Sequence, residues 1–129
     1  MAAVVRVKPR HVSPVGYEWI DVCELFEDVV AGDFLQFTGT VNSNMPVMKK
    51  CPAVANAEPD GIALKAGYAG QRGLDYGIHC EVDGFSGLTP GQLIYSSAAV
   101  AGGQDTAANG TAPVSGKAVR ANRIRFTLR

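Results

Sequence analysis

Turn-forming residues divide this chain into short segments, and their spacing constrains the fold more than any other feature. The 129 residues include 15 glycines and 7 prolines. Signals such as Pro59-Asp60-Gly61 and Pro90-Gly91 separate short runs rich in β-branched and aromatic residues. Such runs, spaced roughly 10–15 residues apart, are typical of a small β-barrel or β-sandwich. The candidate strands are residues 33–39, 46–51, 61–65, 76–85, 93–96 and 119–128.

In residues 22–30 the apolar side chains have a different spacing from that of a strand. Apolar residues within 22–30 recur at intervals of three and four, as on one face of a helix. Asp21 followed by Glu24 resembles a capping box, and Gly32 offers a helix end. The pattern predicts a short helix over residues 22–30, with a strand as the alternative.

The stretch YGIHCEVDGF, residues 76–85, concentrates residue types that bind metals and transfer protons. Successive side chains of a strand point to opposite faces, so its cysteine points away from its histidine and its acids. A half-buried strand with one solvated face explains the alternation, and a metal or acid–base site is the alternative. The strand hypothesis predicts that Ile78, Cys80 and Val82 are buried and that His79, Glu81 and Asp83 are more exposed.

Charge and cysteine content exclude several classes of protein. Twelve basic and twelve acidic residues give a formal net charge of zero, which offers no general attraction for nucleic acid or a membrane surface. No segment is apolar enough for a signal peptide or a membrane span. Cys23, Cys51 and Cys80 are far apart and form no C-x-x-C pair. We therefore expect free thiols in a reducing compartment, with no disulfide among them.

Basic residues gather near the carboxyl end. A solvated strand face, or a patch that matches an acidic partner, is one interpretation of them. A groove for single-stranded nucleic acid in a small β-barrel module is the alternative. Phe126, the aromatic residue nearby, faces away from them by strand parity, which weakens that alternative. This possible interface patch comprises Lys117, Arg120, Arg123, Arg125 and Arg129.

The first 20 residues form a separate candidate region. Valines alternate with basic residues, but Pro9 and Pro14 prevent a regular helix. We expect an extended arm over residues 1–20, followed by a domain over residues 21–129. The arm is expected to dock on a neighbouring subunit or another protein, and to be dispensable for folding. Its candidate binding residues are Val4, Val5, Arg6, Val7, Lys8, Arg10 and Trp19.

No catalytic constellation is found in the sequence. Gly67, Gly70 and Gly73 suggest a phosphate loop, but a strand follows them instead of a helix, and the Lys-Ser/Thr pair is missing. No serine occupies a G-x-S-x-G elbow. We therefore expect a protein that is not an enzyme and uses no metal or other cofactor.

The order of several segments resembles the small cement, or decoration, proteins of tailed-bacteriophage capsids. In that family a strand opens after an A-G-D turn, and a G-[IV]-A strand leads into an alanine- and glycine-rich connection. Later strands carry G-[DQ]-x-[IV]-Y and G-x-A motifs. The resemblance covers roughly residues 30–129 and rests on VVAGDFLQF, DGIALKAGYAGQRGLDYGIHCEVDGF, LTPGQLIYSS and GKAVRANRIRFTL.

This resemblance implies a β-barrel or β-tulip domain that forms homotrimers outside the mature head, contacts the major capsid protein and stabilises the expanded shell. It also implies a place in the virion after synthesis in the bacterial cytoplasm. We expect a mainly β fold with at most one or two short helices, without a membrane or a small-molecule substrate as partner. The family has no catalytic residues to assign.

Overall fold

The computed structural model describes residues 3–12 and 18–128, and β-strands provide its regular structure. The described residues contain no helix, which confirms the mainly β prediction, and they offer no helical candidate for a membrane span. The strands are β1 (Val5–His11), β2 (Trp19–Leu25), β3 (Phe34–Asn42), β4 (Met45–Lys50), β5 (Gly61–Ala63), β6 (Leu74–Ser86), β7 (Leu93–Ser96), β8 (Gln104–Asp105), β9 (Gly116–Arg120) and β10 (Arg123–Thr127).

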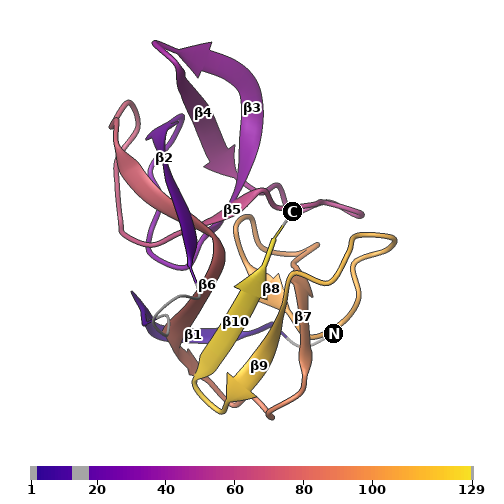
Figure 1. Cartoon of the computed structure of the whole chain (residues 1–129). Coiled ribbons are helices and arrows are strands. Elements are labelled where there is room, and N and C mark those ends of the chain that lie inside the picture. Colours follow the sequence, from indigo (N-terminus) through magenta and orange to yellow (C-terminus); the bar gives the residue numbers. More distant parts are fainter. Residues whose placement is uncertain (1–2, 13–17, 129) are drawn as a thin grey trace.

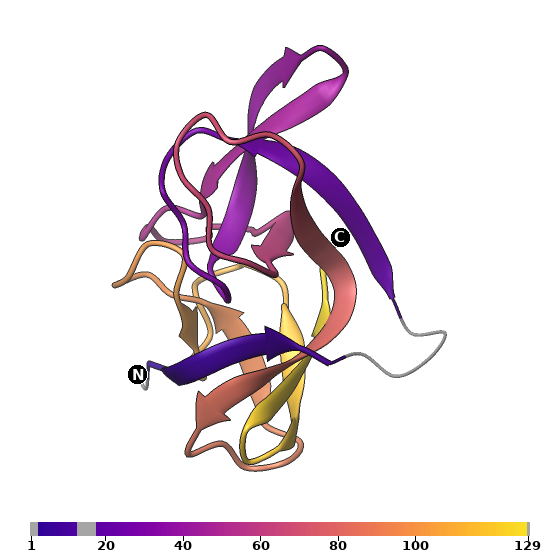
Figure 2. The same cartoon turned by 90° about the vertical axis from the view of Figure 1, so that its left-hand side faces the viewer.

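Strand β6 joins the two halves of the molecule (Figure 1, Figure 2). It pairs along one edge with β2 and then β1, and along the other with β5 and then β10. Its first half closes a ring of five strands in the order β2-β4-β3-β5-β6. Its second half continues the sheet through β10, β9, β7 and β8. A bridge between Ala3 and Asp105 then connects β8 to the residues just before β1.

The buried apolar residues form two core clusters. Ile78, in the middle of β6, packs against both cores and so couples them. In the larger core, the ring of Phe126 meets the rings of Phe34 and Phe85 edge-on at centroid distances of 5.5 and 6.1 Å. The core of the five-strand ring contains Cys23, Leu25, Val29, Leu35, Met48, Ala63, Leu74 and Tyr76.

The predicted helix over residues 22–30 is wrong. Residues 19–25 form β2, which pairs with β6 and β4, and the following residues form turns and an isolated bridge. Cys23 and Leu25 are buried with the spacing of a strand, while Phe26 is 65% exposed. A helix of this length is marginal by itself, so pairing with two strands outweighs its local preference.

The two faces of β6 are partly as predicted. Cys80 and Val82 are buried, as expected, and Ile78 is half-buried between the two cores. The predicted exposure of Glu81 is wrong, because this carboxylate is only 3% exposed. Its burial follows from arginine partners on β10, which parity within a single strand cannot reveal.

The three cysteines are buried free thiols. Burial is the main cause that raises the pKa of Cys23 and Cys80 to about 12 and that of Cys51 to about 11. These thiols are therefore protonated at neutral pH, and they act as small apolar side chains instead of nucleophiles.

Candidate functional site

The charged face of β6 and β10 unites two groups of residues that are far apart in the sequence. Antiparallel pairing sets Arg125 opposite Glu81 and Arg123 opposite Asp83. Glu81 and Asp83 of β6 are thus cross-strand neighbours of Arg125 and Arg123, two members of the predicted basic patch. The acidic partner of these two arginines lies within the same chain.

Arg123 makes the best-defined contact of this face. Its Nε donates to Asp83 Oδ1 at 2.6 Å and its second terminal nitrogen donates to Asp83 Oδ2 at 3.2 Å. This two-pronged geometry suits the planar guanidinium fork. The hydrogen bond from Arg123 is the main cause that holds the pKa of Asp83 below its ordinary value. Asp83 is therefore ionised across the physiological range.

Glu81 is the buried centre of the charged face. Arg125 Nε donates to Glu81 Oε2 at 2.9 Å, and an Arg123 nitrogen lies 3.7 Å from Glu81 Oε1. The Glu81 side chain is 3% exposed, whereas that of Arg125 is 48% exposed. A buried carboxylate that contacts two guanidinium groups suits a structural ion pair.

His79 does not join these acids in a metal site. Thr127 is its cross-strand partner on β10, and its ring meets Trp19 edge-on at a centroid distance of 5.7 Å. Among residues 3–12 and 18–128, no three His, Cys, Asp or Glu side chains gather closely enough to hold a metal ion. Trp19 itself is 58% exposed, so the core position that is usual for tryptophan does not apply here.

The rest of the predicted basic patch is divided. Lys117 lies on β9 beside Arg125, and Arg120 lies at the end of β9 beside Arg123. Both side chains are exposed. Arg129 lies outside the described residues. The patch is therefore interleaved with acids instead of forming a continuous basic groove along β10.

The predicted arm is extended, and its described part lies along β6 of the same chain. Within β1, Val5 pairs with Ser86 and His11 pairs with Val82. The predicted boundary after residue 20 falls inside β2, and residues 1–2 and 13–17 lie outside the described part. Docking of the arm on another chain remains a prediction.

The valines of β1 point outward, and Arg6 between them points inward. Val5 and Val7 are 58% and 72% exposed. Arg6 points inward, and its Nε donates to Gln104 Oε1 at 3.0 Å while a terminal nitrogen reaches Asp33 Oδ1 at 2.6 Å. Sequence reasoning missed this contact because Asp33 and Gln104 are remote from Arg6 along the chain. The A-G-D turn gave no sign of an arginine partner.

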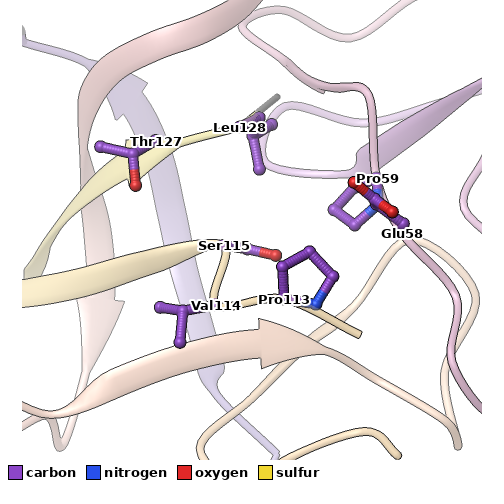
Figure 3. A pocket seen from close by; sticks show the side chains of 7 residues that line it. All are labelled: Glu58, Pro59, Pro113, Val114, Ser115, Thr127 and Leu128. Carbon is purple, nitrogen blue, oxygen red and sulfur yellow. The ribbon is translucent and has the colours of Figure 1, made fainter. Parts of the chain in front are cut away.

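Two of the hollows on the described surface differ greatly in size. One is lined by Lys8, Pro9, Arg10, Asp83, Gly84 and Asn122 and has a volume of about 430 Å³. The other, near the carboxyl end, is bordered by Pro59, Pro113, Ser115 and Leu128 (Figure 3). It is a surface crease without room for a water molecule, so it offers no ligand site.

No family model, no curated protein and no solved structure matches this chain. The likeness to the capsid cement proteins therefore rests on the ordered motifs between residues 30 and 129.

Proposed function

We propose that this chain is a structural protein that decorates the outside of a mature bacteriophage head, as a homotrimer bound to the major capsid protein. The ordered series of motifs between residues 30 and 129 carries this proposal. The motifs coincide with strands and the turns before them. Ala31-Gly32-Asp33 precedes β3, the G-I-A motif is β5, and Gly116-Lys117-Ala118 begins β9.

The chemistry of the charged face favours a structural role over catalysis. Asp83 and Glu81 are each held by arginines of β10. The cysteine thiols are buried, and their raised pKa values keep them protonated. Groups held in this way stabilise a fold and are poorly suited to transferring protons or attacking a substrate.

Exposed apolar side chains offer surfaces for contacts between subunits or with a shell. Val5 and Val7 point outward from β1, which pairs only with β6 within the described residues. An edge strand with outward valines suits a protein contact. Other exposed apolar side chains are Trp19, Val22, Phe26, Val30, Phe37, Val41, Val54, Tyr68, Leu93, Val100 and Val114.

Stabilisation of a shell follows from differential binding. A protein that binds the expanded shell, and not its precursor or its free subunits, shifts the equilibrium toward the expanded form by mass action. A trimer that contacts several capsid subunits at once gains avidity of about 10²–10⁴ over a single contact. Such a function needs surfaces and a rigid fold, and no reactive group.

Sedimentation and head-binding measurements test this proposal. We expect the purified protein to sediment as a trimer, to bind expanded heads at saturable sites, and to raise their melting temperature. Unexpanded precursor shells are the control, and they should bind much less protein. A monomer that has no effect on head stability would exclude the decoration function.

A further inference from the structure

The hollow between β1 and the turn joining β9 to β10 has walls that are fixed by backbone contacts. We name it the basic groove, lined by Lys8, Pro9, Arg10, Asp83, Gly84 and Asn122. Gly84 has a φ of +101°, and a Cβ there would lie 2.0 Å from the Lys8 carbonyl oxygen, so only glycine lets β1 approach β6 this closely. The Asn122 carbonyl accepts from the Gly84 and Phe85 amides at 3.1 and 3.2 Å, which holds the opposite wall.

The basic groove has an excess of positive charge. Asp83 is the one acid among the described residues that line the groove, and both of its carboxylate oxygens accept hydrogen bonds from Arg123. Arg10 lies farther from Asp83, at 3.8 Å, and its side chain is 75% exposed. Lys8 is also exposed on the rim. The Arg10 and Lys8 charges are therefore only weakly compensated by Asp83 and face solvent.

The groove chemistry selects among anionic ligands. Guanidinium, ammonium and carboxamide groups donate hydrogen bonds that suit carboxylate oxygens. None of the described residues that line the groove is aromatic, and Phe85 and Phe126 are buried in the core. Stacking of bases, which supplies much of the affinity of proteins for single-stranded nucleic acid, has no platform here. A volume of about 430 Å³ admits a few amino-acid side chains.

We propose that the basic groove binds an acidic segment of a partner protein, with Lys8 and Arg10 holding its carboxylates and Asn122 donating a hydrogen bond from the opposite wall. Arg123 stays engaged with Asp83 and keeps this carboxylate from occupying the groove. Binding of this kind weakens as salt rises, because the rim charges are exposed to solvent.

Titration of the full-length protein with a short polyglutamate peptide at low salt tests this inference. We expect saturable binding that weakens with added salt, measured by calorimetry or by NMR shifts of the groove residues. Arg10→Glu and Lys8→Glu should each lower the affinity by about tenfold or more, since they place like charges beside the ligand. Asn122→Asp should also weaken binding, although it leaves both rim cations in place.

Lys117→Glu is the matched control, because it makes the same change of charge at an exposed position on β9, outside the groove lining. It should change the affinity by less than about twofold. Equal losses from Lys117→Glu and Lys8→Glu would overturn the groove assignment, as would the absence of peptide binding at low salt. Tighter binding of an oligothymidine than of polyglutamate would assign the surface to nucleic acid instead. The melting temperature of each variant is measured to check that it is folded.

This inference does not depend on the decoration proposal. Peptide binding uses the isolated protein, whereas decoration is measured on heads. If the protein binds the peptide but not heads, the decoration proposal fails and the groove proposal stands. If it binds heads but not the peptide, the groove proposal fails and the decoration proposal stands.

Discussion

Arg6 and Asp33 form an ion pair of 2.6 Å that fastens the first strand of the chain to the turn before β3. Their side chains are 21% and 6% exposed. Asp33 also accepts a hydrogen bond from the Val30 amide at 2.9 Å, and Arg6 reaches Gln104 and the Gly102 carbonyl. One guanidinium group thus holds together segments near residues 6, 33 and 104.

Arg6→Ala is expected to lower the free energy of unfolding by about 2–4 kcal/mol, because it leaves the buried Asp33 carboxylate without its cation. Chemical denaturation provides the measurement. Arg10→Ala is the control on the same strand, and it should cost less than about 1 kcal/mol because its ion pair with Asp83 is long and exposed. Equal losses from the two variants would contradict the fastening role of Arg6.

Glu81→Gln is expected to destabilise the protein by about 2–4 kcal/mol, since Arg123 and Arg125 would lose the buried anion between them. Asp75→Asn on the same strand is the control. Its carboxylate is 42% exposed and pairs with Lys65 at 3.9 Å, so a loss below about 0.5 kcal/mol is expected. If Glu81→Gln were as stable as Asp75→Asn, the ion pairs of Glu81 would make no net contribution to the free energy of unfolding.

The dependence of stability on pH separates Asp83 from Asp60. The hydrogen bond from Arg123 lowers the folded pKa of Asp83 below its ordinary value of 3.8. The ionised Asp83 therefore stabilises the fold fully when the pH is above 3.8, and this stabilisation is lost as the pH falls through the folded pKa. Asp83→Asn should therefore show a shallower loss of stability on acidification. Burial raises the folded pKa of Asp60, so its ionisation opposes folding and protonation relieves this cost.

Asp60→Asn should accordingly make the acid-induced loss of stability steeper than in the parent protein. Urea unfolding at a series of pH values from neutral to strongly acidic measures both slopes. The same change of slope in the two variants would contradict these assignments.

Val7→Asp tests whether the outer face of β1 contacts another protein. The side chain is 72% exposed, so the substitution should change the stability by less than about 0.5 kcal/mol. If β1 contacts the shell or a neighbouring subunit, occupancy on expanded heads or trimer formation should fall. Val54→Asp, at a position 52% exposed in a loop, is the control. If the Val7→Asp variant still forms a trimer and reaches full occupancy on heads, the outer face of β1 is not part of an interface.

Local patterns in the sequence predicted the mainly β class and several of its strands. Residues 93–96 form β7 as expected, and Gly91 adopts a positive φ value in the predicted Pro90-Gly91 turn. Alternation also predicted the burial of Cys80 and Val82. These features depend on neighbours one or two positions away, where side-chain parity and turn chemistry act directly.

Tertiary structure decided how these strands are paired and, through that pairing, the character of the charged face. Register set Arg125 beside Glu81, which buried a carboxylate that parity had placed in solvent. Pairing with β4 and β6 made residues 19–25 a strand where local periodicity favoured a helix. Arg6 turned inward because Asp33, 27 positions away, offered it a buried charge. Each outcome depends on contacts between distant segments, whose energies exceed local propensities of a few tenths of a kcal/mol.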